Sequence, residues 1–368
     1  MKKYDYIIVG SGLCGTVMAE RLERARKSVL IIEKRNHIGG NCYSYQYPGT
    51  NIEVHKYGTH IFHTCSNDVW RYVNRFVEFN RYRHRVLTIC QGKVYSMPIN
   101  LATINSFYNA NYSPAEAINF IASKRQYMKH ATNLEQKALT LIGKDLYEAF
   151  IKGYTIKQWG CNPTHIPAST LTRLPVRYSY NDCYFNDYYQ GLPVEGYTTL
   201  FKKMLHGVPL EVKTDFFDDR EKWMKRCHTL IYTGPIDRYF EYACGRLKWR
   251  SLKFEIQQMN VYDYQGTSVM NYADIDTPYT RIHEPKHLHL EKKQDRKSTV
   301  IIREYPHLND KEPYYPVNSP EDKKMYSQYR VLASKEKRVI FAGRLAEYKY
   351  YDMNEVIEKC LNTKLSVQ

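Results

Sequence analysis

Four residues near the start of the chain have the types and the spacing that bind the pyrophosphate of a dinucleotide. Gly10, Gly12 and Gly15 match the pattern G-x-G-x-x-G, and Glu33 follows at the end of the next apolar run. The first glycine permits a tight turn, the second permits backbone approach to a pyrophosphate, and the third permits close helix packing. The acid accepts hydrogen bonds from ribose hydroxyls and repels a 2′-phosphate. These residues predict a dinucleotide site.

The glycines are useful only if a strand, a helix and a second strand position them. Residues 6–9 and 29–32 are apolar runs of the kind that is buried in parallel sheets, and residues 16–26 between them have helical composition. The helix would begin at the glycines, where its free N–H groups and its dipole favour an anion. A glycine pattern alone is weak evidence, but this strand–helix–strand–acid order predicts a dinucleotide-binding βαβ unit.

Three further segments favour FAD over NAD as the dinucleotide. Glu33 is followed by a Gly-Gly pair at 39–40, as in the extended FAD fingerprint of the amine oxidase and related flavoproteins. Residues 230–235 and 339–344 each resemble a strand that ends at a glycine, where open α/β sheets bind ligands. Many flavoproteins carry an aspartate where this chain has Arg344. An arginine there suits an anionic substrate or a charged flavin.

These segments predict an α/β fold with a discontinuous, Rossmann-like FAD-binding domain and two inserted parts. The FAD-binding domain is expected over residues 1–80, 196–242 and 325–368. A helical domain is expected over 81–150, and an antiparallel sheet that forms the substrate domain is expected over 151–195 and 243–324. Such insertions would leave a cleft above the flavin.

Aromatic residues and arginines are the candidates for that cleft. Phe150 and Tyr154 share a helical face and Trp159 follows them, so they could stack on a base. The pattern alone favours core packing for these rings. The chain contains 35 tyrosines, and several lie beside arginines, the usual phosphate donors. The clusters are Arg173 with Arg177 and Tyr184, then residues 278–281, 313–316 and 348–353.

The composition makes several other classes of protein less favoured. The net charge is +16, but the basic residues are scattered, which favours attraction of a small anionic substrate over nucleic-acid binding. Nine cysteines without a CxxC pair predict reduced thiols in a cytoplasmic protein and no zinc site. His60 and His63 lack further ligands at metal-binding spacing, so no metal is expected. The chain shows no signal peptide and no apolar run long enough for membrane insertion.

Taken in order, five segments resemble the UDP-galactopyranose mutase family of the bacterial type. They are IEKRNHIGGN at 32–41, YGTHIFHT at 57–64, KGYTIKQWG at 152–160, YTRI at 279–282 and GRLAEYKYYDM at 343–353. The resemblance extends over nearly the whole chain and is far more specific than the glycine pattern.

The resemblance implies interconversion of UDP-galactopyranose and UDP-galactofuranose without net redox change. In this family the FAD acts in its reduced form: N5 attacks the anomeric carbon, UDP leaves, and the sugar ring opens and recloses on the adduct. The cofactor is then the nucleophile, which fits the lack of a nucleophile motif in the sequence. The resemblance also implies NADPH or NADH as external reductant, a homodimer, and a role in cell-wall polysaccharide synthesis.

The resemblance gives roles to individual residues. Phe150 and Tyr154 would form the uracil platform beside Trp159, and Arg173 would close on the diphosphate opposite Arg281. The expected catalytic residues are Arg173, Arg281, His63 and His60. The expected substrate-binding residues are Phe150, Tyr154, Trp159, Arg173, Tyr184, Arg281, Tyr315 and Tyr350. The glycine pattern and the resemblance together predict cofactor contacts at Gly10, Gly12, Leu13, Gly15, Glu33, Lys34, Gly40, Asn41, His60, Gly343, Arg344, Tyr350, Asp352 and Met353.

Two departures from the family pattern leave alternatives open. Thr59 stands where a smaller residue is expected, and His84 stands where an asparagine near the sugar is common. Another UDP-hexopyranose therefore remains a possible substrate. An FAD-dependent oxidoreductase of the amine oxidase type is a second alternative, and a basic scaffold or nucleic-acid-binding protein with a vestigial flavin site is a third.

Overall fold

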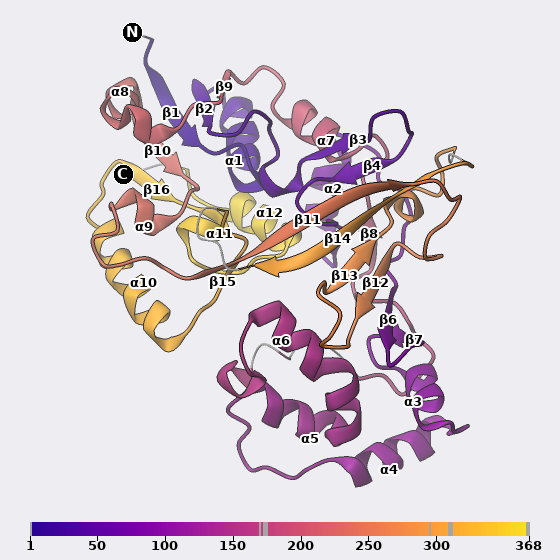
Figure 1. The fold of residues 1–368 in the computed structure, drawn as a ribbon. Helices are drawn as coiled ribbons and strands as arrows, with labels where there is room; N and C mark the ends of the chain where they lie inside the picture. The colour runs from indigo at the N-terminus through magenta and orange to yellow at the C-terminus, as the bar shows by residue number, and fades with distance from the viewer. Residues whose placement is uncertain (1, 169–170, 172–175, 294–295, 308–311, 366–368) are drawn as a thin grey trace.

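A parallel sheet, a second, longer sheet and a group of helices make up the molecule (Figure 1). The structure is a computed structural model that describes residues 2–168, 171, 176–293, 296–307 and 312–365. The helices α3–α6 lie apart from the parallel sheet, and the long strands β11 and β14 run between these two regions (Figure 1).

The parallel sheet has five strands in the order β16-β10-β1-β2-β9. Its central strand β1 pairs with β2 and with β10, so that Ile8 lies beside Ile31 and Ile231. Those three side chains enter one apolar core, while their neighbours Ile7 and Leu30 enter the core on the other face. This alternation is expected of strands that are buried on both faces. The strands are β1 (Tyr4–Val9), β2 (Val29–Glu33), β9 (Leu210–Val212), β10 (Cys227–Tyr232) and β16 (Val339–Phe341).

Helices cover both faces of the parallel sheet. One face carries α1 (Leu13–Arg24), α2 (Asn67–Asn74), α7 (Tyr197–Met204) and α12 (Met353–Asn362), whose apolar residues share one core. The other face carries α8 (Arg220–Arg226) and α9 (Ile236–Tyr239), with Trp223 and Tyr239 fully buried. The helix α10 (Pro320–Ala333) packs beside them through Tyr329, and α11 (Gly343–Ala346) follows β16 directly.

The second sheet has seven strands in the order β15-β11-β14-β13-β12-β6-β7. All neighbouring strands are antiparallel except β12 and β6, which are parallel. The strands are β6 (Val86–Cys90), β7 (Lys93–Met97), β11 (Trp249–Met259), β12 (Val269–Tyr272), β13 (Arg281–His283), β14 (Thr299–His307) and β15 (Tyr315–Pro316). Two short pairs complete the strands: β3 (Ser44–Gln46) with β4 (Glu53–His55), and β5 (Phe62–Thr64) with β8 (Tyr189–Gly191).

The helical part begins with α3 (Leu101–Tyr108) and α4 (Pro114–Lys124). It continues through α5 (Leu134–Leu146), a π-helical turn η2 (Tyr147–Lys152) and α6 (Gly153–Trp159). The helix α4 begins after Ser113, which forms a reciprocal capping box with Glu116. A separate apolar core holds these helices together and includes Ile104, Ile121 and Leu146.

The expected fold class is confirmed, but two stretches differ from the expected division of the chain. Residues 86–97 were expected among the helices and form the strands β6 and β7 of the second sheet. Residues 151–159 were expected with the sheet, yet η2 and α6 continue the helix through them. Single-strand patterns do not reveal which sheet a strand joins, because pairing partners lie far away in sequence. Among the described residues, no helix combines the length and the apolar character needed to cross a membrane.

Candidate active site

The glycine loop between β1 and α1 is built so closely that side chains are excluded. A Cβ added to Gly15 would lie 2.0 Å from the carbonyl oxygen of Gly10, so the helix could not begin against this turn. Gly10 itself has a φ of 101°, which favours glycine. A Cβ on Gly40 would lie 2.8 Å from the Cα of Gly12, so a second loop touches the first. The tight turn at Gly10 and the close packing at Gly15, both expected from the sequence, are present in the backbone.

A cavity of about 470 Å³ opens beside this loop, at the carboxyl ends of the parallel strands. Most residues expected to touch a cofactor line it, namely Gly10, Gly12, Leu13, Glu33, Lys34, Gly40, Asn41, His60, Gly343, Arg344 and Met353. Gly15, Tyr350 and Asp352 are not among the lining residues. Gly15 packs behind the turn, and Asp352 precedes α12, where its N–H donates to Glu355 at 2.7 Å.

Two features of the cavity wall suit an adenosine diphosphate group. No side chain caps the N-terminus of α1, and its first turn has no acid, so its N–H groups can meet an anion. Glu33 is 5% exposed and accepts hydrogen bonds from the N–H and the hydroxyl of Ser11, at 2.8 and 2.9 Å, and from Arg35 N–H at 2.8 Å. A carboxylate has about four acceptor positions. Glu33 therefore keeps an acceptor position for a ribose hydroxyl while Ser11 and Arg35 hold it in place.

His60 and Arg344 also line this cavity. The His60 ring contacts the carbonyl of Gly58 at 2.7 Å through Nδ1. Burial, together with the charge of Arg344, lowers the pKa of His60 to about 4, although the hydrogen bond to Gly58 opposes this shift. His60 is therefore neutral near pH 7. The Arg344 guanidinium donates to the Tyr351 carbonyl at 2.7 Å and lies 4.9 Å from the centre of the Tyr350 ring.

A second polar group surrounds Arg281 on β13. Its guanidinium donates to the Tyr154 hydroxyl on α6, and its Nε lies 3.4 Å from Glu304 on β14. Burial lowers the pKa of Arg281, but the charge of Glu304 and the interaction with Tyr154 together outweigh burial, so this pKa lies above its ordinary value. Burial raises the pKa of Glu304, but Arg281 and the hydrogen bond with His283 together outweigh burial, so this pKa lies below its ordinary value. The pair is therefore charged. His283 contacts the second Glu304 oxygen at 3.1 Å and helps to hold it.

Tyr315 and Tyr350 connect the two groups. Their rings stack with centres 5.6 Å apart, and the Arg344 guanidinium covers Tyr350. Burial raises the pKa of Tyr315, which also feels the charges of Glu304, Arg281 and Arg344. Tyr315 is therefore a neutral hydroxyl donor, and it lies close to arginines of both groups.

A third group brings His63 of β5 and His84 together with the segment before β8. His63 lies 2.5 Å from Asp187 through Nδ1 and stacks on Phe185 with ring centres 3.7 Å apart. Tyr184 packs edge-on against His84 at 5.3 Å. Burial lowers the pKa of His84 to about 3, and the charge of Arg281 contributes to this shift. His84, which departs from the family pattern, therefore lies within the electrostatic reach of Arg281.

Phe150 and Trp159 pack with the helical part of the molecule. Phe150 is 5% exposed and contacts Tyr95 with ring centres 5.0 Å apart. Trp159 is half-buried against the same core. Core packing was the interpretation that the sequence pattern favoured, and Phe150 has that role in the structure. Arg173, the expected mobile arginine, lies outside the described residues.

Sequence reasoning missed several residues of this site. Glu304 faces Arg281 across paired strands, and the pairing register is needed to find it. Asp187 reaches His63 because the strand β8, which begins two residues later, pairs with β5. On the cavity wall, Asp215 forms an ion pair with Arg238 at 2.9 Å. No signal in the sequence marks residues 214–217, because they follow a very short strand.

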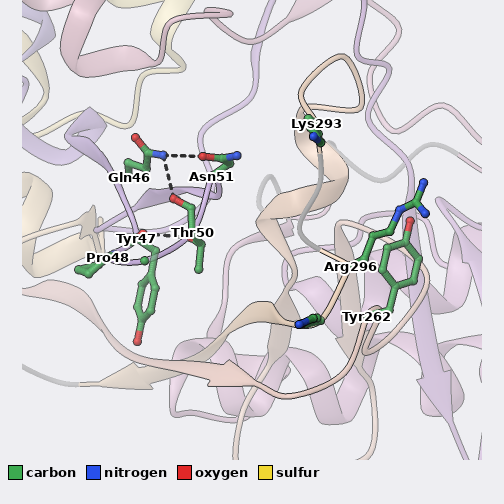
Figure 2. A pocket seen from close by; sticks show the side chains of 10 residues that line it. Gln46, Tyr47, Pro48, Thr50, Asn51, Tyr262, Lys293 and Arg296 are labelled. Carbon is green, nitrogen blue, oxygen red and sulfur yellow. Dashed lines mark hydrogen bonds between the residues drawn. The ribbon is translucent and has the colours of Figure 1, made fainter.

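Two other features of the surface hold no predicted site residue. A hollow of about 1070 Å³ lies between the turn at 46–51 and the exposed cations Lys293 and Arg296 (Figure 2). Its cations are surface side chains on one wall, and the other wall is a turn. It lies outside the clusters described above.

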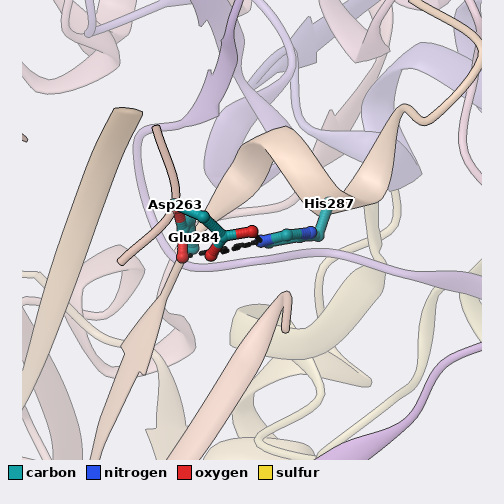
Figure 3. Close-up of side chains that lie close together, drawn as sticks. All are labelled: Asp263, Glu284 and His287. Carbon is teal, nitrogen blue, oxygen red and sulfur yellow. Dashed lines mark hydrogen bonds and ion pairs between the residues drawn. The ribbon is translucent and has the colours of Figure 1, made fainter. Parts of the chain in front are cut away.

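Asp263, Glu284 and His287 bring potential metal-ligand atoms within 4.8 Å of one another (Figure 3). Glu284 already accepts hydrogen bonds from the N–H groups of Tyr264 and Gln265, at 3.0 and 2.9 Å, and from the hydroxyl of Thr299 at 2.6 Å. His287 contacts Asp263 at 3.2 Å. This buried carboxylate therefore holds the loop before β12, which accounts for the cluster without an ion.

Comparison with known families gives two matches along the chain. Residues 149–350 match the family model described as UDP-galactopyranose mutase. Residues 8–76 match the model described as NAD(P)-binding Rossmann-like domain. The first match covers the helix with Tyr154 and the strands with Arg281 and Glu304. The second covers the glycine loop.

Named relatives extend this similarity over nearly the whole chain. A protein of Klebsiella pneumoniae named "Probable UDP-galactopyranose mutase" is 42% identical over 99% of this chain and 94% of its own length. The dTDP-fucopyranose mutase of Escherichia coli is 40% identical over 96% of each chain. The UDP-galactopyranose mutase of Mycoplasma pneumoniae is 31% identical over 98% of this chain and 95% of its own.

Solved structures share the fold at much lower identity. A reduced UDP-galactopyranose mutase has a TM-score of 0.74 at 14% identity, covering 98% of this chain and 93% of the other. A redesigned putrescine oxidase has a TM-score of 0.56 at 10% identity, covering 98% and 97%. At these identities the comparison concerns the fold alone, and an oxidase and a mutase both share it.

Proposed function

This chain belongs to the UDP-galactopyranose mutase family, and we propose that it interconverts UDP-galactopyranose and UDP-galactofuranose with reduced FAD as a covalent catalyst. Bound reduced FAD would supply N5 as the nucleophile that holds the anomeric carbon, in a flavin–sugar adduct, while UDP is detached and the ring changes size. The observation that carries the proposal is the contact of Arg281 with Tyr154. The charge of Arg281 reaches Tyr315, whose ring stacks on Tyr350 beneath Arg344 of the cavity wall.

The cavity fits the adenosine diphosphate half of FAD. The uncapped N-terminus of α1, the backbone contact of Gly12 with Gly40, and the acceptor capacity of Glu33 are the features that such a ligand needs. Lys34, Asn41, Gly343 and Met353 would contact the cofactor from the other walls. The neutral His60 would meet it as a hydrogen-bonding group rather than as a cation.

The chain's own residues would bind the diphosphate and stabilise it as UDP leaves. Arg281 carries a permanent charge that Glu304 holds in position, and charge on a leaving phosphate is what such a site must stabilise. Tyr184, Tyr315 and Tyr350 would add neutral hydroxyl donors, which stabilise an anion without further cations. Arg173 would close on the same phosphates. The uracil would stack near Tyr154 and Trp159, with Phe150 as packing behind them.

The covalent step can be tested directly. Enzyme reduced with dithionite and incubated with UDP-galactose is treated with sodium borohydride, and the flavin is then analysed by mass spectrometry. We expect a flavin carrying the mass of one hexose. If turnover proceeds and trapping yields unmodified flavin at every time point, covalent catalysis by the cofactor is wrong while the isomerase activity stands.

The similarity to dTDP-fucopyranose mutase supports a second candidate substrate. That relative is 40% identical, nearly as similar as the Klebsiella protein at 42%, so identity alone does not select the nucleotide sugar. A panel of UDP-galactofuranose and dTDP-fucofuranose, assayed side by side with reduced enzyme, decides between them. We expect the larger kcat/KM for UDP-galactofuranose. A preference for the dTDP sugar would reassign the substrate.

Three further properties belong to the same proposal. The nine cysteines are free thiols in the structure, and a cytoplasmic location suits them. NADPH or NADH would serve as the external reductant. A homodimer is expected from the family resemblance, and light scattering of the purified protein measures the mass that distinguishes a dimer from the 43.7 kDa monomer.

A further inference from the structure

The helix α6 contacts the second sheet at its start, through Gly153, and is bound to it further along by Lys157 and Arg250. Gly153, at its start, packs so closely on the loop between β12 and β13 that an added Cβ would lie 2.4 Å from the carbonyl oxygen of Ala273. One turn later, the ammonium group of Lys157 binds backbone carbonyls at the same loop. The helix is therefore fastened to the loop that leads directly into Arg281.

Lys157 uses all three of its donors on backbone carbonyls of that loop. Its Nζ donates to Tyr272 at 2.8 Å, to Asp274 at 2.8 Å and to Tyr279 at 3.0 Å. These carbonyls belong to both sides of the hairpin that joins β12 to β13. The Lys157 ammonium group thus joins the two sides of the hairpin and binds the hairpin to α6. One of the bound carbonyls, that of Tyr279, lies two residues before Arg281.

Arg250 on β11 binds the other end of α6. Its guanidinium donates to the Gln158 carbonyl at 3.1 and 2.8 Å and reaches the Lys157 carbonyl at 3.4 Å. Those carbonyls are at the C-terminus of the helix, where a cation is favoured. Arg250 is 4% exposed and lies opposite Tyr315 in the pairing of β11 with β15. The end of α6 is therefore fixed to the position of Tyr315.

We propose that Lys157 and Arg250 are positioning residues that set the distance between α6 and the sheet strands that bind the diphosphate. Tyr154 and Trp159 lie on the fastened helix, while Arg281 and Tyr315 lie on the strands to which it is fastened. The donation from Arg281 to Tyr154 crosses the gap that the two cations control. This inference rests on the proposed function, since it assigns the two sides of that gap to uridine and to the diphosphate.

The test compares Lys157→Met with Lys152→Met. Lys152 lies five positions earlier, its side chain is 44% exposed, and it contacts only Glu148 at 3.9 Å among the described ion pairs. Misplacement of a binding group by about 1 Å can cost a factor of about a hundred in rate. We therefore expect Lys157→Met to lower kcat roughly a hundredfold and to weaken UDP binding, measured by calorimetry, roughly tenfold. Lys152→Met should match the wild type in both.

A double-mutant cycle with Tyr154→Phe separates positioning from general destabilisation. If Lys157 acts through the Tyr154–Arg281 contact, the double variant should be within about twofold of Lys157→Met alone, because the contact is already lost. If the decrease in kcat of the double variant equals the product of the decreases in the two single variants, the proposal is wrong. A Lys157→Met variant with unchanged kcat and UDP affinity would also overturn it.

Two further variants keep the test decisive if Lys157→Met folds poorly. Lys157→Arg keeps the cation and its donors and should recover most of the UDP affinity, while Arg250→Met should repeat the loss from the other end of α6. If either variant behaves otherwise, Lys157 and Arg250 do not position α6 as proposed. UDP affinity can be measured without turnover. If the wild-type protein binds UDP but does not convert UDP-galactofuranose, the proposed function is wrong, and the positioning role can still be tested through UDP binding.

Discussion

At the scale of single residues, two glycines of the same loop should respond differently to the same substitution. Gly12 has ordinary backbone angles, and a Cβ there would lie 3.8 Å from Gly40, a normal contact. A Cβ on Gly15 would lie 2.0 Å from the Gly10 carbonyl oxygen. The first glycine therefore leaves room for the ligand, while the second leaves room for the protein itself.

We expect Gly12→Ala to give folded protein that has lost FAD, and Gly15→Ala to unfold more easily by about 3 kcal/mol. The flavin absorbance per protein and the urea denaturation of the two purified apoproteins measure these effects. Gly12→Ala that retains its full yellow colour would show that the pyrophosphate does not approach this residue.

Arg281 should affect both the rate and the stability, because its loss leaves the buried Glu304 carboxylate without its cation. A charge-assisted hydrogen bond contributes about 1.5–3 kcal/mol, so its loss from the leaving-group side corresponds to a rate decrease of roughly ten- to a hundredfold. We expect Arg281→Met to lower kcat by that factor while the flavin spectrum is retained. Steady-state assays with reduced enzyme measure it. A change in KM alone would place Arg281 in ground-state binding instead.

At the scale of elements, the connection between α6 and the β12–β13 hairpin should make the enzyme sensitive to alkaline pH. Burial lowers the pKa of Lys157 to about 8, although the charge of Asp274 opposes this shift. A neutral amine has two N–H donors for three carbonyls. We therefore expect UDP affinity and kcat to decrease as the pH rises through about 8, and Lys157→Arg to move this decrease to higher pH.

The stability of the protein should change in the opposite direction over the same range. The unfolded chain keeps the Lys157 proton up to about pH 10.5, whereas the folded chain releases it near pH 8. The unfolded state then binds more protons, so the Lys157 contribution to the free energy of unfolding increases between pH 8 and 10.5. Urea denaturation of wild type and Lys157→Met across this range isolates that contribution. A decrease in it would show that the lost activity reflects unfolding.

At this scale the sequence also shows its limits. The strand–helix–strand unit at the glycines could be predicted, because its chemistry and its periodicity lie within one short segment. The continuous helix through Phe150 and Tyr154, and the strands at 86–97, could not be assigned to their layers. Their placement depends on pairing and packing with residues more than a hundred positions away, as for β6 with β12.

At the scale of the whole molecule, the division into a cofactor-binding sheet and a second sheet with helices could be predicted in outline. Individual contacts of the site could not. Glu304 holds Arg281 through strand register, and Lys157 and Arg250 hold α6 through backbone carbonyls that no motif records. The family resemblance predicts Arg281, Tyr154 and Tyr315 as site residues, and the structure shows which side chains hold them in position.

The whole molecule combines a cavity suited to a dinucleotide with a polar group around Arg281 that we propose binds the diphosphate. An oxidase of the same fold would turn over with oxidised flavin, whereas the proposed mutase needs a reduced cofactor and consumes no reductant. The redox requirement therefore separates the two functions that share this architecture.

The most direct test follows UDP-galactofuranose by liquid chromatography with the same enzyme preparation in its oxidised form and after dithionite reduction. We predict conversion to UDP-galactopyranose by the reduced enzyme only, with the flavin still reduced when the reaction reaches equilibrium. Equal rates with fully oxidised flavin, or reoxidation of one flavin for each sugar converted, would contradict this account.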